Sequence, residues 1–233
     1  MSQPLNPMKG FIEIEVRDRE GRVIQKGRHE MRSFTNNFLK ILEGFFNAYG
    51  NYPPGYDARP ATKTTVVAPD GTSKDAWIEA YFYYAYGVNT YTYSGGVAMA
   101  TRAGAGVDSY GIVVGSGTAP FNLNDRALAT KIAHGTGAGQ LSYDPVSLDD
   151  LGLDTSVSPP VYRLRLVRGF KNLTSSPITI TEVGVFARNY WKHYASVFVD
   201  VMFLIARDVL PSSYTVPAGG SATVAVVIEV VMG

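Results

Sequence analysis

Apolar and polar residues alternate along residues 11–17 (FIEIEVR), near the start of the chain. Ile12, Ile14 and Val16 fall on one face of an extended strand, because successive side chains point to opposite sides. A turn containing Asp and Gly follows at residues 18–21, and the chain then returns. The pattern predicts a β-hairpin with one buried face and one face in water.

The hydrophobic period changes to that of a helix at residues 33–49 (SFTNNFLKILEGFFNAY). Four large side chains recur every three or four positions on one stripe: Phe38, Leu42, Phe45 and Tyr49. We therefore expect one amphipathic helix near residues 34–49, lying with its wide apolar stripe against a sheet or a neighbouring subunit. A hydroxyl of Ser33 or Thr35 is expected to cap its first turn.

Further strand-length apolar runs follow, separated at short intervals by turn residues. The clearest runs are residues 62–68, 110–114, 161–170, 178–187, 196–210 and 215–233. Between them we expect a short helical turn near residues 125–132 and a surface loop over residues 144–160. No strand–helix–strand alternation is visible, so the expected fold is all-β: an antiparallel β-sandwich, jelly-roll-like, with one helix. The whole chain, residues 1–233, is expected to form one domain.

Residues 50–106 depart from this pattern, since they are rich in Tyr, Thr and Gly and poor in Leu and Ile. We interpret them as an insertion, and the proline-containing residues 1–9 as an N-terminal arm. Aromatic side chains with polar tips suit a core, a subunit interface or a platform for stacking sugars, and the sequence leaves these open. The residues expected at an interface between copies are Trp77, Tyr81, Tyr83, Tyr84, Tyr86, Tyr91, Tyr93, Phe38 and Phe45.

The amino-acid composition excludes several classes of function. Charged residues make up 18% of the 233 positions and the formal net charge is +1. A surface poor in charge suits a subunit that its neighbours cover. The near-neutral balance gives no electrostatic basis for binding nucleic acid or anionic membranes. The absence of cysteine excludes disulfides and thiolate nucleophiles. We see neither a secretory signal nor a membrane-spanning run, so we expect synthesis as a soluble protein in a cytoplasm.

Motifs for catalysis are equally lacking. Residues 115–117 (Gly-Ser-Gly) follow a strand as a phosphate loop would, but no Gly-Lys-Ser/Thr sequence comes next, so a plain turn is expected. The three histidines, His29, His134 and His193, are not at the spacing of metal ligands. We predict that the protein is not an enzyme and uses no metal or cofactor.

Two clusters of like charge are interpreted as solvated surface. The acidic cluster, Asp144, Asp149, Asp150 and Asp154, lies in the expected loop and matches no calcium-binding loop. The basic cluster comprises Arg163, Arg165, Arg168 and Lys171. Because Arg163 and Arg165 alternate with apolar residues, we expect them on the outer face of a strand, in water or in salt bridges.

Three segments together resemble tail and appendage proteins of bacteriophages and archaeal viruses. The first is residues 111–132 (GIVVGSGTAPFNLNDRALATKI). The second is residues 178–231, with ITEVGVF, LIARDVL and TVPAGGSATV in that order. The third is residues 33–42 (SFTNNFLKIL), similar to a short segment near the N-termini of those proteins. The resemblance implies a virion structural protein with a β-sandwich domain repeated in a symmetric assembly, and no catalytic residues.

The expected function is therefore self-assembly into a virus particle component, in a tail, baseplate, fibre or capsid-associated role. The expected partners are copies of the chain and other virion proteins, in a virion made in the host cytoplasm. Two alternatives stay open: a host extracellular filament or surface-layer subunit, and an adhesin that binds carbohydrate such as a host surface glycan. Neither nucleic acid nor a membrane is expected as a partner.

Overall fold

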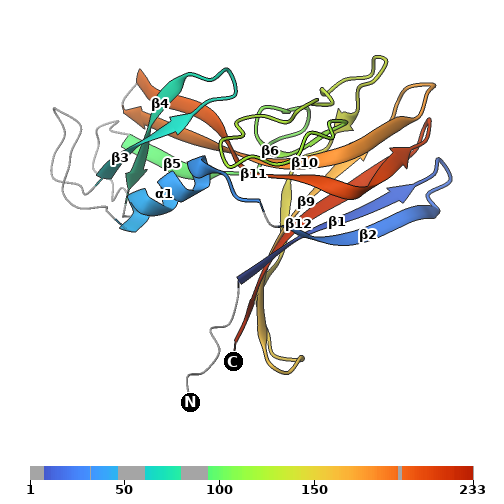
Figure 1. Cartoon of the computed structure of the whole chain (residues 1–233), viewed down its shortest axis with the longest axis horizontal. Helices are drawn as coiled ribbons and strands as arrows, with labels where there is room; N and C mark the ends of the chain where they lie inside the picture. The colour runs from blue at the N-terminus through green and yellow to red at the C-terminus, as the bar shows by residue number, and fades with distance from the viewer. Residues whose placement is uncertain (1–7, 32, 47–60, 80–93, 194–195, 233) are drawn as a thin grey trace, which may run out of the picture.

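The computed structural model describes residues 8–31, 33–46, 61–79, 94–193 and 196–232 (Figure 1). Antiparallel sheets pack against each other in a sandwich-like arrangement, and the described residues include one helix. The expectation of a mostly β, sandwich-like protein with a single helix in this part of the chain is confirmed.

Sheet A is the larger sheet, with the strand order β2-β1-β12-β9-β7 and β8 paired to β9. Its strands are β1 (Met8–Arg17), β2 (Val23–Met31), β7 (Ser142–Tyr143), β8 (Ser147–Asp154), β9 (Val161–Lys171) and β12 (Ser221–Val231). All of its ladders are antiparallel. β1 and β2 form the predicted hairpin, and Gly21 in its turn has a φ of 82°, which glycine adopts without strain.

Sheet B is built on one long hairpin. Its strands are β5 (Ser94–Ala100), β6 (Gly111–Gly115), β10 (Ile178–His193) and β11 (Ser196–Val216). The sequence placed a break between the apolar runs at 196–210 and 215–233, but β11 continues through Pro211 to Val216. The proline falls where the ladder is interrupted, between the pairs Glu182–Val209 and Ile180–Tyr214, on an edge strand. An edge strand tolerates proline at such an irregularity because no ladder hydrogen bond is lost.

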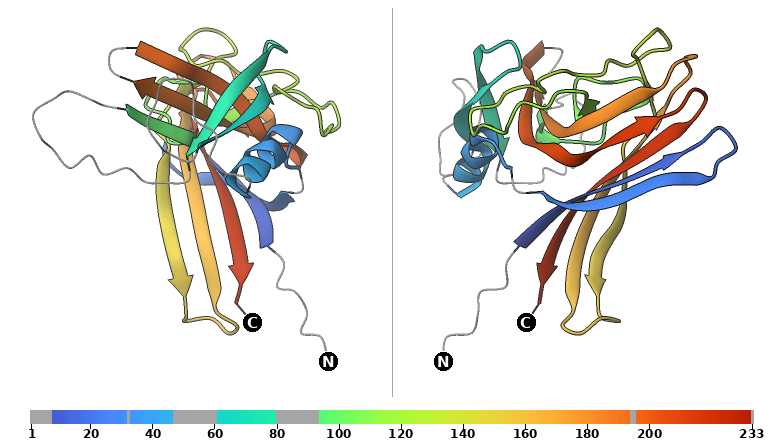
Figure 2. Two further views of the ribbon diagram at one scale, coloured as in Figure 1. Left: turned by 90° about the vertical axis from the view of Figure 1, so that its left-hand side faces the viewer. Right: turned by 45° about the vertical axis from the view of Figure 1, so that its right-hand side comes forward.

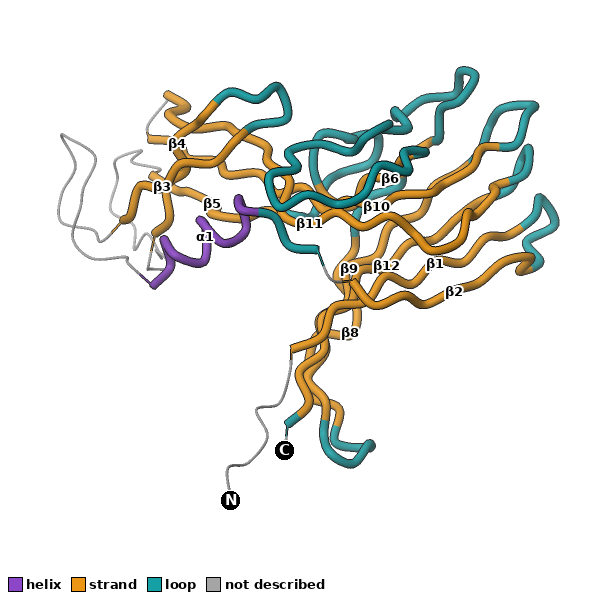
Figure 3. The backbone as a smooth tube through the Cα atoms, viewed as in Figure 1, coloured by secondary structure: helices purple, strands orange, loops and turns teal. Residues whose placement is uncertain are grey.

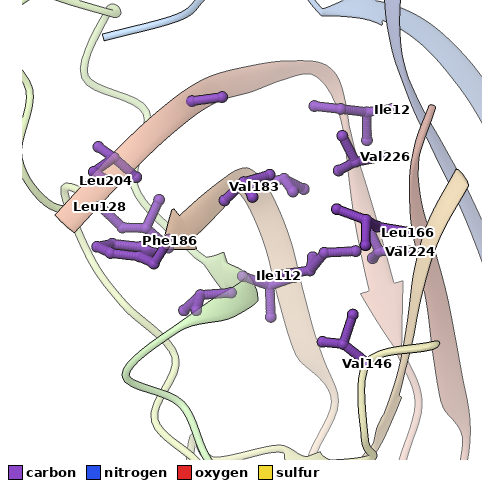
Figure 4. Packing of buried hydrophobic residues seen from close by; sticks show 14 of the residues in the cluster. Ile12, Ile112, Leu128, Val146, Leu166, Val183, Phe186, Leu204, Val224 and Val226 are labelled. Carbon is purple, nitrogen blue, oxygen red and sulfur yellow. The ribbon is translucent and has the colours of Figure 1, made fainter. Parts of the chain in front are cut away.

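The hydrophobic core lies between the inner faces of the two sheets. Figure 4 shows side chains of sheet A pointing toward side chains of sheet B and its loops. Sheet A contributes Ile12, Leu166, Val224 and Val226, while sheet B and neighbouring loops contribute Ile112, Leu128, Val183, Phe186 and Leu204. The alternation that predicted the buried face of β1 is confirmed, since Ile12, Ile14 and Val16 are each at most 2% exposed.

Helix α1 (Asn36–Phe46) lies beside a two-stranded sheet of β3 (Ala61–Val67) and β4 (Ser73–Glu79) at the far end of the β10–β11 hairpin (Figure 1). The Asn37 amide pairs with the backbone of Val67 through both its oxygen and its nitrogen, at 2.8 and 2.9 Å. The face that is fully buried contains Asn37, Ile41 and Gly44, so it is rotated from the predicted Phe38–Leu42 stripe, whose members are half-buried.

The predicted hydroxyl cap of α1 is wrong. The Thr35 hydroxyl donates to the Leu204 carbonyl at 2.6 Å, and the Ser33 hydroxyl donates to the Asp208 carboxylate at 2.7 Å. Both hydroxyls therefore attach the start of the helix to β11. The Thr35 carbonyl, rather than its side chain, receives the first helical N–H groups.

The predicted helical turn near residues 125–132 and the predicted loop over residues 144–160 are also wrong. In the first segment the backbone N–H groups of Ala129 and Thr130 donate to the buried Glu182 carboxylate, so they do not enter a helical ladder. The second segment contains strand β8, which is ion-paired to β9 along its length.

One end of sheet A extends beyond sheet B. Figures 2 and 3 show the β8–β9 hairpin and the end of β12 reaching away from the rest of the sandwich, toward the chain ends. The strands that make up this projection are the first residues of β1 and β9 and the last residues of β8 and β12.

Hairpin β1–β2 contacts sheet B through His29 and Tyr214. The His29 Nε2 atom lies 2.6 Å from the Tyr214 hydroxyl, in a partly buried contact with the rings edge to face. Gly27 lies beneath this contact, and a Cβ atom there would collide with the Tyr214 hydroxyl. The contact therefore requires glycine at position 27 for reasons of space, not of backbone conformation.

We expect Gly27→Ala to lower the free energy of unfolding by about 1–3 kcal/mol, because the added methyl group overpacks the contact. The double variant Gly27→Ala/Tyr214→Phe should recover part of the lost stability, because it lacks the Tyr214 hydroxyl. Gly104→Ala is the matched control, since a Cβ there meets no atom within 4 Å. Urea denaturation gives the free energy of unfolding of wild type, Gly27→Ala, the double variant and Gly104→Ala. Equal losses at Gly27 and Gly104 would contradict the close contact.

Burial lowers the pKa of His29 below its usual value of 6.5. The folded state then binds protons less readily than the unfolded state, so stability is complete above the unfolded pKa and declines as the pH falls through it. Between about pH 8 and about pH 5, wild type should lose more stability than His29→Gln, measured by thermal melting. Parallel pH profiles for the two proteins would show that His29 makes no contribution.

Candidate functional site

Most of the aromatic residues predicted at an interface lie outside the described part of the chain. This holds for Tyr81, Tyr83, Tyr84, Tyr86, Tyr91 and Tyr93, and for the side chains of Trp77 and Phe45. Phe38 is described: it is half-buried, and its ring stacks on Phe34 with the centroids 4.5 Å apart. This ring therefore packs against another side chain of the same molecule, just before the start of α1.

The three segments that carry the resemblance meet at one buried cluster. At its centre is Glu182 of β10, whose side chain is 0% exposed. Its carboxylate accepts four hydrogen bonds: from the backbone N–H groups of Gly117, Ala129 and Thr130 and from Arg207 Nε, at 2.8 to 3.1 Å. The first segment thus supplies three donors, and β11 supplies the fourth.

Arg207 of β11 completes the cluster. Its side chain is 2% exposed and forms ion pairs with Glu182 at 2.8 Å and with Asp125 at 2.7 Å. It also donates to the Ala119 carbonyl at 2.8 Å and to the Pro120 carbonyl at 3.4 Å. Burial by itself lowers the pKa of Arg207, but hydrogen bonds to the two carboxylates outweigh it and the pKa is raised. The guanidinium stays charged, and each of its three nitrogens donates at least one hydrogen bond.

The third segment joins the same place through its backbone. The Arg207 N–H donates to the Ser33 carbonyl at 3.1 Å, and the Thr35 N–H donates to the Ile205 carbonyl at 3.0 Å. Residues 33–35 therefore run alongside β11 where the ion-paired cluster is buried. The cluster's role is architectural, because protein groups occupy both carboxylate oxygens of Glu182 and every nitrogen of the Arg207 guanidinium.

A second buried arginine, Arg168 of β9, also bonds to loop backbone, and its hydrogen bonds go to carbonyl groups. Its side chain donates to five backbone carbonyls, those of Gly104, Val107, Tyr110, Ile112 and Asp144, at 2.5 to 3.3 Å. Its guanidinium also lies over the Tyr143 ring, 4.7 Å from the centroid. Burial lowers the pKa of Arg168 and raises that of Tyr143. The expectation that Arg168 belongs to a surface basic patch is wrong.

The outer face of sheet A carries charges that pair with one another. Arg163 pairs with Asp154 and Glu229, at 2.8 and 3.1 Å. Arg165 pairs with Asp149 and Glu13, at 2.8 and 3.3 Å. The interpretation of Arg163 and Arg165 as a salt-bridged outer face is confirmed.

A shallow hollow of about 530 Å³ lies over the same outer face, between β1, β2, β9 and β12. Its charged lining includes Glu13, Glu15, Lys26, Arg28 and Arg165. These charges pair within the lining, for example Lys26 with Glu15 at 3.6 Å and Arg28 with Glu13 at 3.4 Å. The lining also includes Arg17, so four basic side chains face two acidic ones and positive charge is in excess in the hollow.

Two negative findings apply to the described residues. Within them, no three His, Cys, Asp or Glu side chains come close enough together to hold a metal ion. Of the expected acidic cluster, Asp144, Asp149 and Asp154 pair with separate basic residues. Among the same residues, none of the helical structure has the length and apolar character needed to cross a membrane.

Where sheet A extends beyond sheet B, its inner face is apolar and exposed. Cross-strand partners place Met8, Val230, Tyr162 and Leu153 side by side in one row. The exposed fractions of Met8, Tyr162 and Leu153 are 55%, 41% and 53%. We call this surface the projecting face, and its members are Met8, Leu153, Tyr162, Leu164, Ile228, Val230 and Met232.

Comparison with protein-family models, with curated proteins and with solved structures finds no match to this chain.

The sequence reasoning missed the buried ion pair and Arg168, although the pattern held signals for both. Arg168 is two positions beyond Leu166, so strand alternation places it on the inner face. Glu182 and Arg207 each lie within a strand-length run that is rich in apolar residues. Charges in such runs are buried only when they are paired. The hairpin register then brings the two together, since Arg207 lies opposite Gly184, two residues from Glu182.

Glu182→Gln is expected to lower the free energy of unfolding by about 3 kcal/mol or more, because Arg207 loses its buried countercharge. Asp149→Asn is the matched control: its contact with Arg165 has the same 2.8 Å length, but the Asp149 side chain is 48% exposed. That change should cost about 1 kcal/mol or less. Chemical denaturation of both variants gives the comparison. Similar losses would contradict a dominant role for the buried pair.

Proposed function

We propose that this chain is a structural subunit of a virus particle, made in the host cytoplasm, that associates with copies of itself and with other particle proteins. Its position would be in a tail, a baseplate, a fibre or a capsid-associated layer. The observation that supports this most is the projecting face. Sheet A keeps its apolar alternation past the end of the sheet that covers it, leaving large apolar side chains in water.

Exposed apolar surface that is contiguous and rimmed by polar groups marks sites of association. The reverse side of the same strands carries the ion-paired Arg163, Glu229 and Asp154, whereas the described side chains of the exposed side carry no charge. The buried polar groups of Glu182, Arg207 and Arg168 serve internal packing, which is consistent with a chain whose function lies in its outer surfaces.

The resemblance of residues 33–42, 111–132 and 178–231 to virion tail and appendage proteins supports the same proposal. These segments are far apart in the sequence, yet their residues share one hydrogen-bonded cluster in the fold. A common structural role explains why the three would occur together in one kind of protein. The jelly-roll-like strand order, the absence of enzymatic activity and the absence of nucleic-acid, membrane and cofactor binding remain part of the proposal.

The proposal is tested by the size of the purified full-length protein. We expect reversible or stable association across the micromolar range in sedimentation velocity, with rings, tubes or other regular particles in negative-stain electron microscopy. Association should persist in high salt, because burial of apolar surface is not screened by ions. A protein that stays monomeric throughout the micromolar range would contradict the proposal.

A further inference from the structure

The projecting face continues the inner face of sheet A without interruption. Nearer the centre, the cross-strand row Ile12–Val226–Leu166 is covered by sheet B and is at most 8% exposed. Four residues further along each strand, the row Met8–Val230–Tyr162 has the same orientation, since side chains two and four positions apart share a face. Both rows consist of apolar or aromatic side chains, but sheet B covers only the row nearer the centre.

Among the side chains that the structure describes, no charged residue belongs to the projecting face. Strand alternation places the neighbouring charges Lys9, Glu229, Arg163 and Asp154 on the reverse face. Three of them form an ion-paired group there, with Arg163 bonded to both Glu229 and Asp154. An occupant of the projecting face would therefore bury none of the described charged side chains, and a surface that matches it would itself be apolar.

We infer that a second copy of this chain covers the projecting face, with the two projections packed face to face. This inference deepens the proposed self-assembly and depends on it. A two-fold contact is self-complementary by construction, so the partner brings the same flat, uncharged, apolar surface. Sheets packed in this way lie about 10 Å apart, the arrangement that sheets A and B already adopt in the core.

The size of the face sets the strength of the contact. Strands lie about 4.8 Å apart and side chains on one face repeat about every 6.8 Å, so four strands and two to three rows cover roughly 400 Å² per copy. A stable interface buries about 800 Å² per partner. Two copies joined by this face alone therefore form a weak, reversible pair. Further contacts between subunits would multiply its effect within a closed assembly.

The test compares three full-length variants with wild type. Leu153→Glu and Tyr162→Glu each place a charge on the projecting face. Leu173→Glu is the matched control, because Leu173 is 57% exposed, close to the 53% of Leu153, and lies outside the face. Thermal melting should show all three variants folded, since each replaced side chain is at least 41% exposed.

In sedimentation velocity across the micromolar range, the two projecting-face variants should need a roughly tenfold higher concentration than wild type to associate. The Leu173→Glu variant should match wild type. If wild type associates and the projecting-face variants associate equally well, the inference is overturned while the proposed function stands. If wild type is monomeric at every concentration, the inference and the proposed function both fail. Binding of that monomer to neutral phosphatidylcholine vesicles through this face would not rescue either of them.

A single cysteine gives a second readout, because the chain has none of its own. Tyr162→Cys should cross-link to its own copy with a short bis-maleimide, since position 162 lies on β9, within the face rather than at its edge. Leu173→Cys should cross-link far less at the same protein concentration. Equal cross-linking of the two would indicate random collision and would overturn the inference.

Discussion

Buried charge bonded to backbone groups holds the irregular part of this fold in place. The segment between β5 and β8 contains little regular ladder apart from the short strands β6 and β7, so its N–H and C=O groups need partners that strands would otherwise supply. Glu182 accepts from the N–H groups of this segment, and Arg168 donates to its carbonyls. Each charged side chain thus replaces several ladder hydrogen bonds, and hydrogen bonds to charged groups are the stronger kind.

The two buried arginines attach this segment to different sheets. Arg168 extends from the inner face of sheet A, in the row of Ile14 and Val224, toward the carbonyls around β6. Arg207 and Glu182 extend from sheet B toward residues 117–130. Because the loops are bonded to both sheets, they fix the distance between the sheets as well as their own path. The apolar core could pack in several ways, whereas these directional contacts favour one.

The sequence predicted those parts of the fold whose pattern is local. The alternation in β1, the turn before β2 and the period of α1 each follow from neighbouring residues, and each is found. The strand β8 was missed because its acidic residues resemble a solvated loop until Arg163 and Arg165 are placed opposite them. The bend at residues 125–132 was missed because its N–H groups bond to Glu182, which is more than 50 positions away.

The candidate surface differs from the one that the sequence suggested, and the reason is geometric. Aromatic residues between positions 77 and 93 stood out by composition, whereas the projecting face contains mostly ordinary aliphatic residues: two methionines, two leucines, and valine and isoleucine from β12, with Tyr162 as its one aromatic member. In the sequence, Met8 and Leu153 are indistinguishable from buried apolar residues such as Ile12 and Leu166. What separates them is where sheet B ends, and that is determined by the length and path of β10 and β11. Strand alternation therefore predicts which side chains share a face, but only the packing of the second sheet determines how much of that face is left for another molecule to cover.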